Sequence, residues 1–187
     1  MNDSIVEWAA LVAEAELRSP LPRRWAHTRG VASRAAKVVS AIANDAALLV
    51  AVATLHDVGY APRLALTGFH PLDGARFLRD EHGAHERLVR LVANHSFALL
   101  EAEERGLREE LTTEFPLLEQ PLLVDALVYC DMTTTPDGDR TTAQDRVAEI
   151  LSRYGDDSVV GRFIRRAAPE ICASVERVES AVAAQPR

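Results

Sequence analysis

The sequence predicts an all-α fold, a single-domain helical bundle spanning residues 1–187. Apolar residues recur every three or four positions along most of the 187 residues, which is the period of a helix with one buried face. No segment alternates apolar and polar residues as a half-buried strand would. The composition, 48% hydrophobic and 26% charged, is that of a globular protein able to bury a core without disulfides. We find no internal repeat, long linker or low-complexity tract.

Clear stop signals separate the predicted helices. Pro20 follows the first, the Asn44-Asp45 pair separates the second from the third, and Pro71 stands at a first helical position. The charged segment 101–115 is left open, because Gly106 interrupts it. The predicted helices cover about 4–17, 23–43, 46–58, 71–81, 84–94, 117–130, 143–154 and 158–183.

Charge and cysteine content narrow the class of protein. With 28 acidic and 21 basic residues the formal charge is −7, which argues against general binding to nucleic acid or to an anionic membrane. A small anionic substrate remains compatible with this charge. Cys130 and Cys172 are too few for a disulfide framework, and no signal peptide or membrane-spanning run is evident. We therefore expect a cytoplasmic protein with a small-molecule partner, and a homodimer is left open.

Several predicted helices carry a histidine or an aspartate along or after an apolar face. His27 shares a helical stripe with Val31, Ala35, Val38 and Ile42, which follow at steps of three or four residues. The run "AALLVAVATL" leads directly into His56 and Asp57, "RLVRLVA" precedes His95, and "LLVDALVYC" precedes Asp131. Four different helices are thus predicted to turn polar groups toward the core.

Two buried carboxylates require compensation. An isolated histidine on an apolar face is most often a satisfied core residue, but an unpaired buried carboxylate is costly. No lysine or arginine lies on the same helical stripes, so neutral imidazoles and carboxylates around a divalent cation are the predicted solution. Nitrogen and oxygen ligands without cysteine suit iron, manganese, cobalt or zinc better than calcium or magnesium.

The same residues carry a resemblance to a known family. His27 in "RWAHTRGVA", the His56-Asp57 pair in "LHDVGY" and Asp131 in "YCDMTT" resemble the H…HD…D signature of the HD-domain metal-dependent phosphohydrolases. The resemblance covers about residues 23–135. It implies an HD core with a flanking N-terminal helix and two C-terminal helices, and a metal ion held by these four residues.

Two further histidines make the pattern similar to that of binuclear HD proteins. His70 in "HPLDGARFL" and His95 in "NHS" lie between the pair and Asp131, and these two stretches resemble bacterial HD-type diadenosine tetraphosphate hydrolases. The resemblance implies a second metal ion held by Asp57, His70 and His95, with Asp57 bridging. Two divalent transition-metal ions are expected, with iron first and manganese, cobalt or zinc as alternatives.

The segment after the His-Asp pair departs from the family pattern. Many HD hydrolases carry a lysine there, whereas this chain reads "HDVGYAPR". Tyr60 takes this place, and Arg63 and Arg76 are the candidate substrate-binding cations. His56 and Asp57 are the predicted catalytic centre.

The predicted function is hydrolysis of a phosphate ester or nucleotide by metal-activated water. No nucleophile elbow, Walker A loop, dinucleotide-binding glycine motif or HExxH helix suggests another chemistry. Two alternatives stay open: a di-iron HD-type oxygenase similar to inositol oxygenase, and a non-catalytic metal- or nucleotide-binding module. His82, His85 and Asp125 are expected at the surface.

Overall fold

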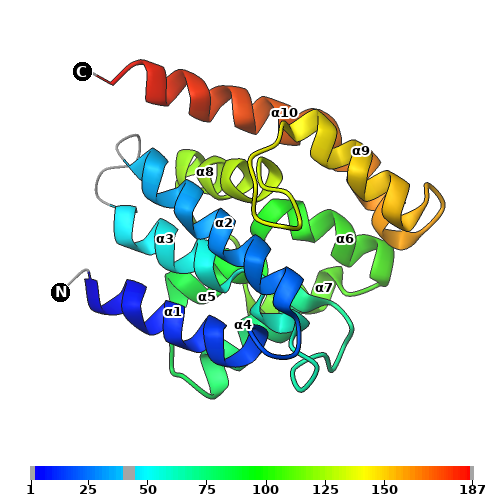
Figure 1. Ribbon diagram of the computed structural model, residues 1–187. Helices are drawn as coiled ribbons and strands as arrows, with labels where there is room; N and C mark the ends of the chain where they lie inside the picture. The colour runs from blue at the N-terminus through cyan, green and yellow to red at the C-terminus, as the bar shows by residue number, and fades with distance from the viewer. Residues whose placement is uncertain (1–2, 40–44, 186–187) are drawn as a thin grey trace.

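Amphipathic helices build the fold that the computed structural model describes for residues 3–39 and 45–185 (Figure 1). Within these ranges the only pairing of extended backbone is an isolated bridge between Thr134 and Arg140. The all-α prediction is confirmed. The α-helices are α1 (Asp3–Leu17), α2 (Pro22–Val38), α3 (Ala46–Leu55), α4 (His70–Asp80), α5 (Glu86–Ala93), α6 (Ala98–Arg105), α7 (Arg108–Glu114), α8 (Pro121–Met132), α9 (Ala143–Tyr154) and α10 (Val159–Ala183).

Most predicted helices occur with small shifts at their ends. The predicted helix 143–154 coincides with α9. Residues 40–43 of the predicted helix 23–43 lie outside the described residues. The charged segment that the sequence left open contains α7 and part of α6, and Gly106 separates the two helices with a left-handed φ of 72°.

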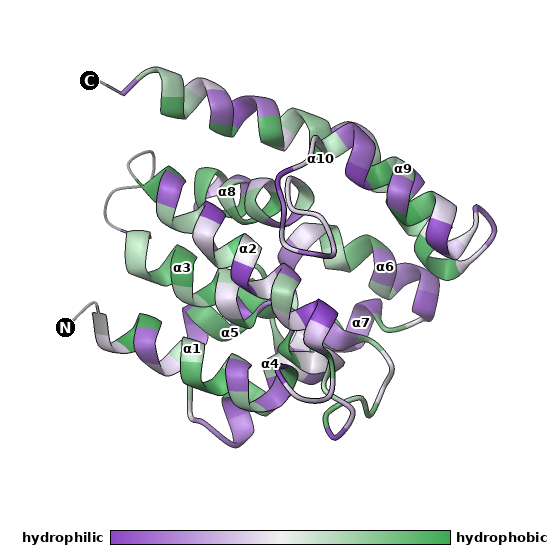
Figure 2. Ribbon diagram, in the orientation of Figure 1, coloured by the Kyte–Doolittle hydropathy of each residue, from purple (hydrophilic) through white to green (hydrophobic). Residues whose placement is uncertain are grey.

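The most apolar helix, α3, lies at the centre of the bundle. It packs against α1, α2, α5 and α8 (Figure 1), and Figure 2 shows hydrophobic residues along most of its length. Leu49, Val52 and Leu55 are almost fully buried. The second half of α3, residues 51–55, is buried, so its last turn ends inside the protein, and the residues that follow it, His56 and Asp57, are buried as well.

The C-terminal helices cover one side of this core. Helix α10 packs on α6, α8 and α9 and carries its apolar residues on the inner face. Asp125 of α8, expected at the surface, is instead buried and forms a bidentate ion pair with Arg177 of α10 at 2.7 and 2.8 Å. The prediction for Asp125 is wrong because α10 covers that face of α8. His82 and His85 are exposed, as expected.

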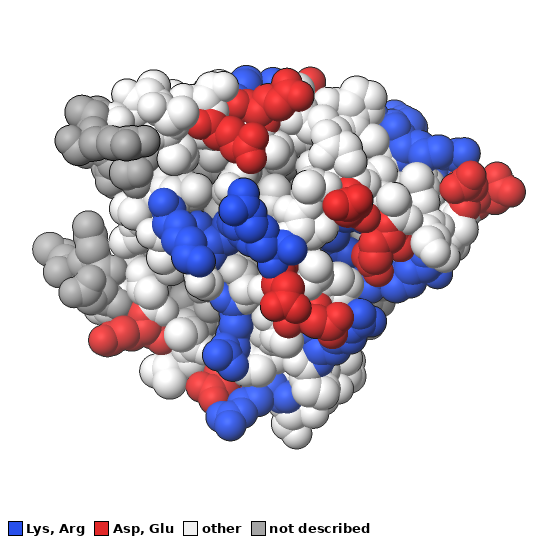
Figure 3. All heavy atoms as spheres, turned by 45° about the horizontal axis from the view of Figure 1, so that its top comes forward, with Lys and Arg blue, Asp and Glu red and all other residues white. Residues whose placement is uncertain are grey.

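No helix in the described part of the chain is long and apolar enough to cross a membrane. On the face shown in Figure 3, basic and acidic groups form several separate small clusters, so no extended surface of one sign covers it.

A close backbone contact sets the position of α4 relative to the short 3-10 turn Val58–Tyr60. A Cβ atom at Gly59 would overlap the His70 carbonyl oxygen and crowd the Gly74 nitrogen. Only glycine allows the turn after Asp57 to lie this close to the start of α4. The spacing between Asp57 and His70 therefore depends on Gly59.

We expect Gly59→Ala to lower the free energy of unfolding by about 2–4 kcal/mol, because the added methyl group must push two backbones apart. Urea denaturation measures the loss. The control is Leu66→Ala, since Leu66 lies in the nearby loop and is 86% exposed. Equal stability of the two variants would contradict the close contact.

Candidate metal centre

The structure brings all six predicted ligands together at the centre of the bundle. His27 lies in the middle of α2, His70 is the first residue of α4, and the others stand at or just beyond the C-terminal ends of helices. The side chain of His70 is 13% exposed, and the other five residues are buried. The five buried ones are His27, His56, Asp57, His95 and Asp131.

Three of the histidines are oriented by the backbone. Each donates its Nδ1–H to a carbonyl oxygen, because a carbonyl can only accept. The neutral ring then presents an unprotonated Nε2 to the interior. The pairs are His27 with Thr135 at 2.9 Å, His56 with Ala53 at 2.8 Å and His95 with Val92 at 2.7 Å.

Asp57 lies between two groups of imidazole nitrogens. Its Oδ2 is 3.3 Å from Nε2 of His56 and 3.7 Å from Nε2 of His27, whereas its Oδ1 is 3.4 Å from Nε2 of His70. Nε2 of His95 lies 3.1 Å from Nε2 of His70. In each group, one formed by His27, His56 and Asp57 and the other by Asp57, His70 and His95, the ligand atoms lie within 4.8 Å of one another. One carboxylate oxygen thus faces each group.

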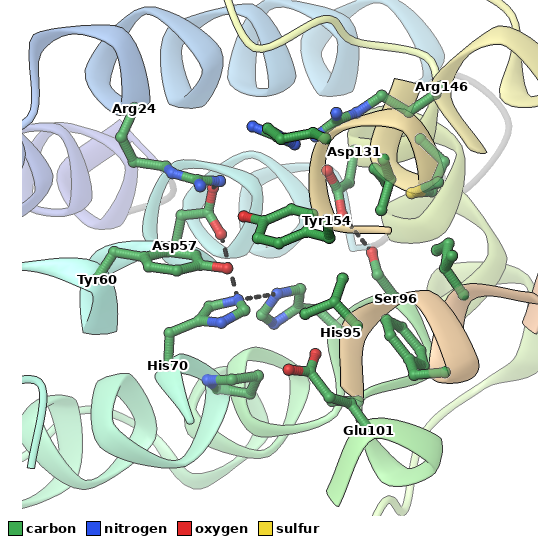
Figure 4. Close-up of a pocket in the computed structure, with 18 residues that line it drawn as sticks. Arg24, Asp57, Tyr60, His70, His95, Ser96, Glu101, Asp131, Arg146 and Tyr154 are labelled. Carbon is green, nitrogen blue, oxygen red and sulfur yellow. Dashed lines mark hydrogen bonds and ion pairs between the residues drawn. The ribbon is translucent and has the colours of Figure 1, made fainter. Parts of the chain in front are cut away.

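Asp131 borders the first of these groups. Its Oδ1 lies 3.1 Å from Nε2 of His27 and 4.0 Å from Nε2 of His56. The hydroxyl of Ser96 donates a hydrogen bond to its other oxygen, as the dashed line in Figure 4 marks. The carboxylate is therefore held with one oxygen directed at the histidines.

The donor set fits divalent metal ions. Nε2 of His56 is buried and has no hydrogen-bond partner among the described residues. Lone pairs of imidazoles and carboxylates face one another at these distances, which is repulsive unless a proton or a cation lies between them. Imidazole nitrogens and carboxylate oxygens are common ligands of transition metals, and the backbone bonds at Nδ1 are typical of such sites.

Residues 24–132 match the HD domain family. The chain belongs to this family. No curated protein and no solved structure matches it significantly. HD domains bind divalent metal ions and are typically metal-dependent phosphohydrolases, and the His/Asp clusters described above are compatible with metal binding.

The six candidate ligands together form what we call the HD centre. Within it, burial and neighbouring charges shift the pKa values in opposite directions. Burial raises the pKa of Asp57, but Arg24 and His56 outweigh it and hold this pKa well below the usual value. Burial also raises the pKa of Asp131, but the neighbouring imidazoles of His27 and His56 outweigh it and lower this pKa. Burial lowers the pKa of His56, but Asp57 reverses the shift and raises it. Both carboxylates are therefore ionised at neutral pH.

Arg24 is the functional neighbour that the sequence analysis missed. Its guanidinium donates to Oδ2 of Asp57 at 2.8 Å and lies 4.0 Å from the centre of the Tyr60 ring. The expectation that no arginine compensates the buried carboxylates is wrong for Asp57. The signal was present, because Arg24 precedes His27 by three residues and so shares its helical face.

Backbone strain lies beside the HD centre. Ser96 and Phe97, which directly follow His95, both have left-handed backbone angles, with φ of 47° and 62°. Such conformations cost about 1–3 kcal/mol each in residues other than glycine and cluster at functional sites. The turn ends α5, directs the His95 ring inward and aims the Ser96 hydroxyl at Asp131.

A pocket opens onto the HD centre, and only one candidate substrate-binding residue lines it. The Tyr60 ring stacks on His70, with 3.9 Å between ring centres, and faces the pocket (Figure 4). Arg63 pairs instead with Glu16 and Glu81, and Arg76 pairs with Glu110 and Glu114. Neither arginine is part of the pocket lining. The structure gives Arg63 and Arg76 a role in tying helices together and offers no support for substrate contact.

The remaining pocket lining comes from several helices, including two that lie beyond the family match. Asp57, His70, His95 and Asp131 form the inner end. Residues of α9 and α10 form the opposite wall. The sequence analysis singled out no residue of that wall, because nothing in the motif extends past Asp131.

We expect the metal-free protein to lose stability as the pH falls from about 6.5 to 4. Burial, with neighbouring His70 and His56, lowers the pKa of His95 to about 4, whereas an unfolded histidine titrates near 6.5. The unfolded chain binds this proton first, so the contribution is complete above pH 6.5 and is lost as the pH falls toward 4.

Urea unfolding of wild type and His95→Gln at several pH values, with a chelator present, measures the contribution of this histidine. The wild type should lose about 3 kcal/mol more than the variant over this range. If the free energy of unfolding depends on pH in the same way in the wild type and in His95→Gln, the lowered pKa of His95 is contradicted.

Proposed function

We propose that this protein is a metal-dependent hydrolase of a phosphate ester or nucleotide that uses two divalent transition-metal ions, with iron as the expected metal. The observation that carries the proposal is the position of Asp57, which faces one group of imidazole nitrogens with each of its oxygens. Membership of the HD family over residues 24–132 supports the same chemistry.

The residues divide between two metal positions. His27, His56 and Asp57 would hold one ion, with Asp131 beside them, and Asp57, His70 and His95 would hold the other. When bound, the ions lower the pKa of a coordinated water toward neutrality and offset the charge of the phosphoryl oxygens. Asp57 and His56 are the central residues of the proposed catalytic site.

The residues around the ligands hold them in place for this reaction. Carbonyl groups fix the tautomers of three histidines, so their Nε2 atoms remain free to bind. Arg24 holds the Asp57 carboxylate at 2.8 Å, and Ser96 holds that of Asp131. Tyr60 stacks between Arg24 and His70 and limits the ring orientations open to His70. Preorganisation of this kind lowers the reorganisation cost of the reaction.

Metal analysis of protein purified without chelator tests the metal positions. We expect about two metal ions per chain in the wild type, since five further candidate ligands are grouped around the carboxylate of Asp57. His70→Gln and His95→Gln should each lower the content to about one ion, because they affect one group only. His82→Gln, a change at an exposed histidine, is the matched control and should keep both ions.

A phosphate-release screen over phosphate monoesters, nucleotides and diadenosine tetraphosphate tests the reaction. The wild type should release phosphate or a nucleotide, and His70→Gln should lose most of this activity because one metal position is removed. The narrower resemblance to diadenosine tetraphosphate hydrolases stays a prediction that the screen examines.

Other outcomes would favour the alternative functions. One ion or none, with His70→Gln unchanged, would contradict the binuclear assignment. An oxygen-dependent spectral change in the iron-loaded protein, without release of phosphate, would indicate an oxygenase. Absence of any turnover, with Asp57→Ala unable to fold, would indicate a non-catalytic module.

A further inference from the structure

Helices α9 and α10 lie outside the segment that matches the HD family, yet they form a wall of the pocket that the candidate metal ligands also line. Their lining residues are arginines, large apolar side chains and Tyr154. The residues of this wall are not candidate metal ligands, so they affect which substrate binds. The inference below rests on the proposed function and concerns the substrate of the same site.

Arg146 of α9 is a buried cation with an unsatisfied donor. Its side chain is 6% exposed, and its Nε has no hydrogen-bond partner among the described residues. It forms an ion pair with Glu149 and lines the pocket on the side of Asp131 (Figure 4). Because an unsatisfied buried donor costs about 1–3 kcal/mol, its position in the pocket suits an anionic ligand.

The charges around the pocket leave a surplus on this wall. Arg24 is neutralised by Asp57, whereas Arg146 and Arg153 share the single carboxylate of Glu149. Two guanidinium groups with one carboxylate carry a net positive charge. Glu101, an acidic residue of the lining, is paired with Arg105 at 2.7 Å and does not offset it.

Most of the rest of the wall is apolar. Ile150, Val160, Phe163 and Ile164 from α9 and α10 join Met132 in the lining, and Tyr154 adds an aromatic ring with a hydroxyl group. The cavity has a volume of about 80 Å³. Such a surface favours an apolar or aromatic group in contact with it.

We propose that Arg146 binds the phosphoryl oxygens of the substrate, and that the substrate is a phosphate monoester with an apolar or aromatic body packed on α9 and α10. Arg146 thus determines specificity from outside the family-matched segment. A guanidinium suits this role because its planar donors match the spacing of phosphate oxygens.

The first test is binding of inorganic phosphate to the metal-loaded full chain, measured by titration calorimetry. Arg146→Gln should raise the phosphate Kd about 10- to 100-fold, the range expected for lost hydrogen bonds to a charged group. The metal content should stay at the wild-type value. Arg165→Gln, which removes an exposed arginine of α10, is the control and should leave the Kd unchanged.

Arg146→Lys keeps the test decisive if the glutamine variant does not fold. Lysine keeps the charge and loses the planar set of donors, so its phosphate Kd should lie between those of wild type and Arg146→Gln. A wild-type Kd in the folded variants would overturn the role of Arg146, and phosphate release by those variants would leave the proposed function intact. If phosphate binding depends on Arg146 but no ester is hydrolysed, the anion site is supported and the proposed function is refuted.

The second test concerns the apolar body and needs no turnover. Phenylphosphonate and methylphosphonate carry the same anionic group, so the ratio of their Kd values reports contact with the apolar wall. We expect phenylphosphonate to bind about tenfold more tightly because the ring buries apolar area. Phe163→Ala should reduce this preference and keep the affinity for methylphosphonate. Equal affinities of the two phosphonates in the wild type would overturn the apolar-body assignment.

Discussion

The buried carboxylate of Asp57 is the constraint on which the rest of the structure depends. It is 3% exposed and lies within 3.7 Å of three imidazole nitrogens, at the end of the most apolar helix of the protein. An ionised group in such a place is tolerated only when cations and donors surround it. Arg24 supplies one charge, and the geometry of the histidines provides for metal ions. Three features hold this arrangement. Helix α3 packs against its neighbours, backbone carbonyls accept hydrogen bonds from three of the histidine rings, and Tyr60 stacks on His70.

Two parts of the chain form the pocket, the HD-family segment and helices α9 and α10. The HD-family segment carries the six candidate metal ligands, and the strained left-handed pair Ser96 and Phe97 lies beside them. Helices α9 and α10 hold no ligand and shape the opposite wall of the pocket. Because α10 is anchored to α8 through the Arg177–Asp125 pair, the wall is positioned relative to the metal centre. The candidate metal ligands and the residues proposed to contact the substrate body therefore lie in different segments, and substitutions can change one set without the other.

Much of the fold and of the candidate site was predictable because both depend on helical periodicity. Helix α9 was placed at its observed ends, and His27, His56, Asp57, His95 and Asp131 converge as the apolar stripes indicated, whereas His70 was indicated only by the family resemblance. The same reasoning failed for charged residues. Arg24 was not recognised as the partner of Asp57, and Asp125 was placed at the surface. Each of these pairs joins two different segments of the chain, and although Arg24 shares the helical face of His27, the sequence does not show which carboxylate it meets.

The fold class, the family and the candidate metal-ligating residues could be read from the sequence, because apolar residues at helical spacing and the order of the His and Asp residues are properties of the linear chain. Only the tertiary structure decided that each oxygen of Asp57 faces a different group of histidines, and that Arg63 and Arg76 lie outside the pocket. It also decided that Arg146 lines the pocket. These depend on the angles at which helices cross and on which side chains then meet, and such contacts are set by packing of the whole bundle rather than by any one segment.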